Sequence, residues 1–384
     1  MTLSDLDLGP VGFRASHDVH DALSSACETN PDLATFETIG RSEEGRPLAG
    51  VTLGHGPRVA TLVAGAHADE PVGPETLRHL VVDGLAARGW GAEGGGLGGL
   101  WREWTLRVVP HANPDAEARN APWISRWAAL ADDPAAMLAS FLCRRRREPP
   151  GRDVEFGYPA MRPENRAVTD FLFADGPPAL HASLHGMAFS EGALLLIEKA
   201  WLGAPEAEGL RAGFREAATR AGLRLHDHDR GGDKGFLYGG PGFWSTPEGA
   251  AMRAHFLGAG DAETASLFHR SSMEQAIHTA ASGGAASGGA ASGASPLCVV
   301  TELPLFVLGA DYDHQGGVAA LAAQFRHRLP LLMEQAHVGD GLDDAVREFG
   351  IRTLDVETAV RLHLRVLDLA LRTAAGGTPE ASGA

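Results

Sequence analysis

The stretch Arg58-Val-Ala-Thr-Leu-Val-Ala-Gly-Ala-His-Ala-Asp-Glu-Pro-Val-Gly73 decides how the chain is interpreted. Its apolar run predicts a short buried strand that ends at Gly65. His67 and Glu70 follow at once, and residues three apart can meet on one side of a single turn. An imidazole and a carboxylate suit a borderline cation such as zinc, which keeps a coordination position open when it is catalytic. The stretch therefore predicts two metal ligands directly behind a strand.

The composition is that of a globular protein. The chain has 384 residues, of which 44% are hydrophobic, and a formal net charge of -16. This length indicates one large α/β domain with additions, or two domains. No apolar stretch approaches the ~20 residues that span a bilayer, and the N-terminus lacks a signal-peptide pattern. We therefore expect no membrane partner and a cytoplasmic location. The negative charge argues against nucleic acid as a partner, since phosphate binding needs a basic face.

Strand and helix patterns alternate along the middle of the chain, as is typical of the α/β class. The expected strands cover 33–39, 48–53, 59–64, 104–109, 179–185, 194–197 and 298–303. The first two should form an antiparallel pair. The expected helices cover 15–30, 74–88, 128–147, 167–173 and 206–221.

The last part of the chain has a different pattern. It is helical over 315–337, 342–349 and 355–373. Between the two parts, the Gly/Ala/Ser-rich stretch 281–295 predicts a flexible loop without chemistry. We expect a catalytic domain at 1–312 and a helical C-terminal extension at 313–384 with a disordered tail. The extension is a candidate contact for an oligomer.

A third ligand should come from a distant strand end, since α/β sheets assemble sites at strand C-termini. His185 ends the strand 179–185 and fits this place, while His181 lies deeper on the same face and is the alternative. Glu302 is a carboxylate on a short apolar strand, where burial is costly unless the group is paired or functional. It is the candidate general base.

With these residues the chain resembles the zinc metallocarboxypeptidases (M14 family). Matching segments occur in order at 39–47, 65–73, 113–115, 163–167, 184–186 and 301–302. The resemblance implies a mixed eight-stranded sheet sandwiched by helices and one zinc ion per chain on His67, Glu70 and His185. It also implies Glu302 as the base for the attacking water. No His-Glu-x-x-His motif occurs, which excludes the thermolysin-like arrangement.

The resemblance does not extend to the segment with which the family binds the terminal carboxylate of its substrates. Its Asp-x-Asn-Arg segment aligns with Asp153-Val-Glu-Phe-Gly-Tyr158, so Glu155 and Phe156 replace the Asn-Arg pair. Glu155 is instead a candidate for binding a cationic substrate group.

Two further family residues have candidates in this sequence. The family's other arginine has the candidates Arg126 and, less well placed, Arg119; its mobile tyrosine has the candidate Tyr238. The basic run at 144–147 is interpreted as a solvated helix end, with a local anion site as the alternative.

Three functions are consistent with these residues. The first is a metallocarboxypeptidase-like zinc hydrolase that cleaves a peptide or peptide-like amide. The second is a deacylase of N-acyl amino acids, which resembles the succinylglutamate desuccinylase and aspartoacylase branch. The third is a zinc-binding protein without turnover, against which the retained base Glu302 speaks.

Overall fold

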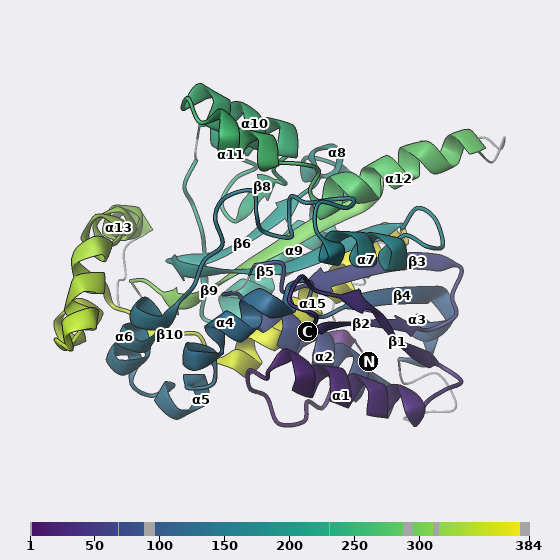
Figure 1. The fold of residues 1–384 in the computed structure, drawn as a ribbon, viewed down its shortest axis with the longest axis horizontal. Coiled ribbons are helices and arrows are strands. Elements are labelled where there is room, and N and C mark those ends of the chain that lie inside the picture. The colour runs from purple at the N-terminus through teal and green to yellow at the C-terminus, as the bar shows by residue number, and fades with distance from the viewer. Residues whose placement is uncertain are drawn as a thin grey trace.

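A mixed β-sheet forms the centre of the protein in this computed structural model, which describes residues 2–67, 69–87, 97–229, 231–286, 295–309 and 315–376 (Figure 1). Within these ranges the sheet has ten strands. They are β1 (Ala34–Arg41), β2 (Pro47–Leu53), β3 (Arg58–Ala64), β4 (Trp104–Val109), β5 (Leu180–Ser190), β6 (Gly192–Ile197), β7 (Arg224–Leu225), β8 (Phe243–Ser245), β9 (Leu297–Val307) and β10 (Arg352–Thr353).

The sheet is mixed because it contains both parallel and antiparallel strand pairs. Its main path runs β1-β2-β4-β3-β5-β9-β6-β7, while β8 pairs with β6 and β10 with β9. The inner strands β4, β3, β5 and β9 are parallel, and β2 and β6 pair antiparallel on either side of them. The predicted mixed sheet is confirmed. Its main path has eight strands, and the two additional strands are too short for a period-two pattern to reveal.

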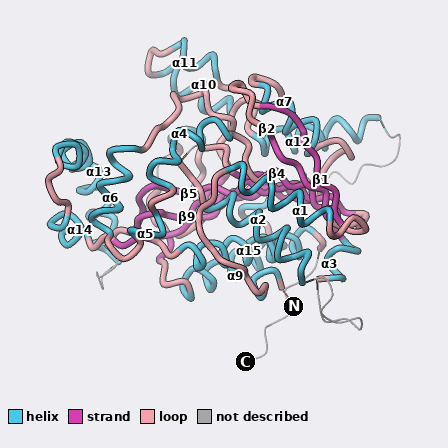
Figure 2. The backbone as a smooth tube through the Cα atoms, turned by 60° about the horizontal axis from the view of Figure 1, so that its bottom comes forward, coloured by secondary structure: helices cyan, strands magenta, loops and turns pink. Residues whose placement is uncertain are grey.

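Helices cover both faces of the sheet (Figure 2). One face carries α1 (Ser16–Glu28), α2 (Val72–Ala86), α9 (Glu208–Arg220) and α15 (Val356–Ala374). The opposite face carries α7 (Pro163–Leu172) and α12 (Ser272–Ala286). Within the described ranges, no helix has both the length and the apolar composition needed to cross a membrane.

The remaining helices lie at the ends of the sheet and around its carboxyl edge. They are α3 (Gly98–Glu103), α4 (Pro114–Ile124), α5 (Trp127–Leu130), α6 (Pro134–Arg144), α8 (Lys199–Leu202), α10 (Gly249–Gly258), α11 (Ala262–Leu267), α13 (Gln315–Val338) and α14 (Asp343–Phe349). Short 3-10 turns cover Leu3–Asp5, Pro205–Ala207 and Asp233–Gly235.

The last helix, α15, is part of the main core. Its apolar stripe of Val360, Leu364, Leu367 and Leu371 is buried, and the helix packs against α2 and α9 below β5. The helical C-terminal region is thus confirmed, and it helps to build the layer beneath the sheet. The division of the chain at residue 312 stays a prediction.

The predicted loop 281–295 is wrong at its beginning. Residues 281–286 belong to α12, because the alanines of this segment favour helix and carry the preceding turns onward. Residues 287–294 and the predicted tail at 377–384 lie outside the described residues.

A buried ionic cluster fixes the first turns of α2. The Glu75 carboxylate is 1% exposed and accepts from Arg78 Nη2 at 2.9 Å and from the backbone N of Gly12 at 3.1 Å. Arg14 and His79 also contact it. Burial alone would raise the pKa of Glu75, but its hydrogen bonds to His79 and Arg78 lower that pKa to about 2.

We expect Glu75→Gln to lower the free energy of unfolding by roughly 3 kcal/mol at pH 7, because the pKa falls from 4.5 to about 2 on folding. The folded pKa is depressed, so this stabilisation is complete above pH 4.5 and is lost as the pH falls from 4.5 towards 2. Urea unfolding of both proteins between pH 3 and 7 measures the difference.

The matched control is Glu103→Gln. It removes a half-exposed ion pair with Arg58 and should change the stability by less than about 1 kcal/mol. Equal effects of the two substitutions would contradict the role assigned to Glu75.

Candidate functional site

The three predicted ligands meet at the carboxyl edge of the parallel strands. His67 and Glu70 lie in the short connection between β3 and α2, and His185 lies within β5. Since β3 and β5 are parallel neighbours, the end of β3 and His185 lie side by side. The connection turns sharply at Gly65, where φ is +66° and a Cβ would lie 3.3 Å from the backbone of His111.

The donor atoms converge. His67 Nδ1 lies 2.9 Å from Glu70 Oε1, and His185 Nδ1 lies 3.0 Å from Glu70 Oε2. The two Nδ1 atoms are 3.0 Å apart. All three ligand atoms fall within 4.8 Å of one another, and two imidazole nitrogens with one carboxylate form a donor set that suits zinc. The residues therefore fit the ion that the sequence implies.

The carboxylates around His67 and His185 favour a positive charge on or between the two imidazoles. Burial alone would lower the pKa of His67, but the Glu70 carboxylate beside it raises that pKa. Burial likewise opposes protonation of His185, yet the carboxylates of Glu155 and Glu70 raise its pKa well above the ordinary value. A cation bound between the two imidazoles would replace the protons that these carboxylates otherwise attract.

A carboxylate and a hydroxyl fix the orientation of His185. Its second ring nitrogen, Nε2, lies 2.7 Å from Ser183 Oγ and 3.3 Å from Glu155 Oε2. The other oxygen of Glu155 accepts from Ser272 Oγ at 3.1 Å. A proton held at Nε2 leaves Nδ1 free to bind a metal. Carboxylates commonly have this role next to a metal-binding histidine, because they accept a hydrogen bond from its second ring nitrogen. With these partners, Glu155 orients a ligand, and the contacts lend no support to its predicted role in binding a cationic substrate.

We expect Glu155→Gln to weaken zinc binding by roughly 10- to 100-fold, because the group that fixes His185 loses its charge. Competition with a chromophoric chelator measures the affinity. The effect on turnover should be the same for cationic and neutral substrates.

The exposed Glu28 supplies the control variant Glu28→Gln, which should leave zinc affinity unchanged. Selective loss of cationic substrates in Glu155→Gln would restore the substrate-binding role.

A cavity of about 550 Å³ opens over the ligands. Glu302 lines it together with His67, Glu70 and His185. In the parallel pairing of β5 and β9, Glu302 is the direct partner of His185. The structure thus brings the predicted base and the predicted ligands to one cavity.

Three predicted residues lie outside the lining of this cavity. Arg126 is exposed and precedes α5. Tyr238 donates to Asp227 and packs with its ring centroid 5.2 Å from that of Trp244. His181 is buried with its Nδ1 2.8 Å from Thr61 Oγ1. The geometry gives no support to a role for Arg126 or Tyr238 at the metal, and it favours His185 over His181 as the ligand.

Sequence reasoning missed Arg145, which lines the cavity together with Arg147. The helix α6 ends at Arg144, and Arg145 leaves it with extended backbone (φ −54°, ψ 135°). Its guanidinium pairs with Asp69, stacks over Phe141 with 4.9 Å to the ring centroid, and lines the cavity. The basic run at 144–147 was the available signal, and its interpretation as a solvated helix end is wrong for Arg145.

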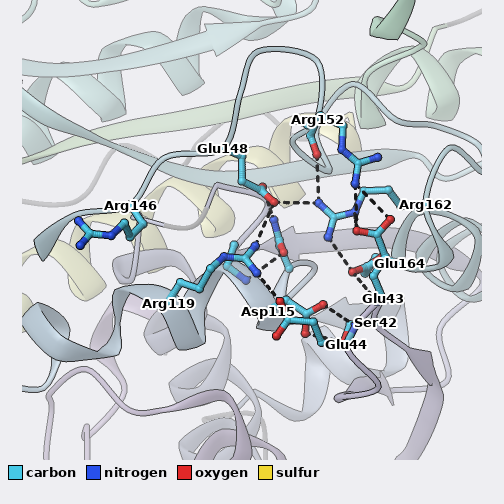
Figure 3. Close-up of polar contacts among 12 residues, drawn as sticks. Ser42, Glu43, Glu44, Asp115, Arg119, Arg146, Glu148, Arg152, Arg162 and Glu164 are labelled. Atoms are coloured by element: carbon cyan, nitrogen blue, oxygen red, sulfur yellow. Dashed lines mark hydrogen bonds and ion pairs between the residues drawn. The ribbon is translucent and has the colours of Figure 1, made fainter.

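An ion-pair network around Arg162 holds the segment 148–158 that carries Glu155 (Figure 3). Arg162 is 2% exposed and lies 3.0 Å from Glu148 Oε1 and 2.8 Å from Glu164 Oε1. Glu148 also accepts from Asn113 at 2.6 Å and pairs with Arg119. The network joins the matching segments 39–47, 113–115 and 163–167, so these motifs support the cavity wall from behind.

Comparison with known proteins agrees with this site. Residues 19–123, which include His67 and Glu70, match the model of the zinc carboxypeptidase family. The predicted resemblance to that family is confirmed over this segment. Together with the donor set, the match supports a zinc metallohydrolase. No curated protein matches the chain in sequence.

Solved carboxypeptidases align with most of this chain at low sequence identity. The metallo-carboxypeptidase of Burkholderia cenocepacia is 15% identical with a TM-score of 0.48, and the alignment covers 93% of this chain and 68% of that one. Carboxypeptidase A of Helicoverpa armigera is 14% identical with a TM-score of 0.46, covering 94% and 74%. At these TM-scores the two structures add no weight to the functional argument, which rests on the site.

Proposed function

We propose that this protein is a zinc-dependent hydrolase that cleaves a peptide or peptide-like amide bond. The observation that carries the proposal is the place of Glu302. It lies directly opposite His185 on the neighbouring strand, and its side chain enters the cavity that holds all three donors. A purely structural metal site has no use for a second carboxylate, beside that of Glu70, at that place.

The chain's own residues have distinct tasks in such a reaction. A zinc ion on the three donors would polarise the scissile carbonyl and activate a water molecule. Glu302 takes the proton from the attacking water and delivers it to the departing amine, which makes it a general base and then a general acid. Arg145, the partly buried guanidinium that pairs with Asp69 and lines the cavity, stabilises negative charge that develops on the carbonyl oxygen.

The proposal is tested with metal-free and zinc-loaded protein. We expect one zinc ion per chain, and turnover of at least one class in a screen of peptides, γ-glutamyl amides and N-acyl amino acids. Chelation should abolish this turnover, and added zinc should restore it.

Each other outcome has a meaning. Turnover of N-acyl amino acids alone would favour the deacylase. Zinc binding without any turnover would favour a binding protein, and turnover that survives removal of zinc would refute the proposal.

A further inference from the structure

A buried histidine of the C-terminal helix lies close to the candidate metal centre. His363 belongs to α15, is fully buried, and has mostly apolar buried neighbours on its own helix. Its Nδ1 lies 3.0 Å from the hydroxyl oxygen of Thr76, a buried residue near the start of α2. Its Nε2 is buried and forms no well-aligned hydrogen bond with any residue that the structure describes. Because buried polar groups are normally hydrogen-bonded, this second nitrogen needs a partner.

The backbone of the metal ligand His185 faces this ring. Burial lowers the pKa of His363 to about 3, although a hydrogen bond with the backbone of His185 acts in the opposite direction. The ring is therefore neutral, with one donor and one acceptor nitrogen. One nitrogen meets Thr76 on α2, and the ring also reaches the backbone of β5 at His185. His363 thus bridges two elements that come from distant parts of the chain.

The strand β5 loses one neighbour at the position of the ligand. β3 ends at Ala64, which pairs with Leu184, whereas β9 continues beside β5 beyond that point. From His185 onward, β5 therefore has a strand partner on one side only among the described strands. A buried backbone group without a strand partner requires another hydrogen-bonding group. The position of His363 allows it to be that group.

The start of α2 packs against the same end of β5. A Cβ at Gly73 would lie 2.5 Å from the backbone oxygen of Leu184, so the absence of a side chain lets the helix approach the strand closely. The donors His67 and Glu70 directly precede this helix. One of the two segments joined by His363 therefore carries two donors, and the other carries the third.

We propose that His363 is a positioning residue of the candidate metal centre, and that the C-terminal helix α15 is an integral part of that centre. The ring holds the backbone at His185 relative to the start of α2. It thereby sets how closely the donor of β5 approaches the donors before α2. This proposal rests on the zinc site of the proposed function, but not on its hydrolytic step.

The zinc affinity of full-length variants, measured by competition with a chromophoric chelator, tests this role. His363→Leu should weaken zinc binding by about tenfold, at the lower end of the range for groups that orient metal ligands. His363→Gln places an amide near the former Nε2 and should restore most of the affinity. His363→Asn places its amide near the former Nδ1, beside Thr76, and should remain weak. This order distinguishes contact with the His185 backbone from simple filling of space.

Two further variants separate positioning from stability. Leu371→Ala removes a buried apolar side chain about two turns further along α15, so it should loosen the helix and leave zinc affinity unchanged. Thr76→Val keeps the shape of its side chain but loses the hydroxyl beside His363, so it should weaken zinc binding as His363→Leu does. The visible absorption of the cobalt-substituted protein reports the geometry of the donors. It should change in His363→Leu and Thr76→Val and remain parental in Leu371→Ala.

The outcomes distinguish this proposal from the proposed function. Parental zinc affinity in both His363→Leu and Thr76→Val, or an equal loss of affinity in Leu371→Ala, would overturn the role of His363. A glutamine variant as weak as the leucine variant would overturn it as well. Zinc binding without turnover in the parental protein would overturn the hydrolase alone, because affinity and cobalt absorption are measured without a substrate. A parental protein that binds no zinc would overturn both.

Discussion

Glu302→Gln is expected to lower kcat by about 10²–10⁴ and to leave one zinc ion bound per chain. The amide of glutamine has nearly the shape of the carboxylate but cannot accept a proton, and general acid-base catalysis contributes this range of rate. Glu302 is not one of the three converging donors, so zinc affinity should be retained. Steady-state kinetics on a substrate from the screen, together with zinc analysis of the same sample, measures both quantities.

Glu37→Gln is the matched control, since it makes the same change at an exposed position of β1. It should keep both zinc and kcat. Equal kcat in the parental protein and in Glu302→Gln would rule out Glu302 as the base. Loss of zinc from Glu302→Gln would instead make it part of the metal centre.

Arg145→Ala is expected to lower kcat/KM by about 10²–10³, mainly through kcat. Removal of a single donor that stabilises a developing oxyanion has this effect in other enzymes. The guanidinium is mostly buried, lines the cavity and lies close enough to Glu70 for their charges to interact. A rise in KM with constant kcat would show that Arg145 binds the ground state of the substrate instead.

The neighbouring Arg146 supplies the control. Its guanidinium is exposed and donates to backbone carbonyls of Cys143 and Arg145, so Arg146→Ala should leave the kinetics unchanged. Arg126→Ala tests the arginine favoured by the sequence. If Arg126→Ala lowers kcat/KM more than Arg145→Ala does, Arg126 is the arginine that acts on the substrate.

The sequence predicted those strands whose own residues determine their structure. The run before Gly65 predicted β3, and the order of apolar segments predicted the inner strands of the sheet, because each buried strand needs a continuous apolar run. Since parallel strands end at the same edge, the same reasoning placed His185 beside His67.

The remaining parts of the site depend on contacts that span the chain. Glu155 meets His185 and Ser272, and Arg145 meets Asp69, across long separations in sequence. Hydrophobic periodicity does not reveal such partners. The spacing from a family motif favoured Arg126, which lies outside the lining of the cavity and stays a prediction. The short strands β8 and β10 likewise exist only because longer neighbours offer them backbone partners.

The ion-pair network around Arg162 has a consequence for how this protein can change. It anchors the segment 148–158 from behind, through residues that are not among the three donors. The donors themselves belong to the connection after β3 and to β5. The anchored segment carries Glu155, whose carboxylate lies 3.3 Å from the second ring nitrogen of His185. A substitution that loosens the Arg162 network would therefore reach the candidate metal centre from a distance, without altering a donor.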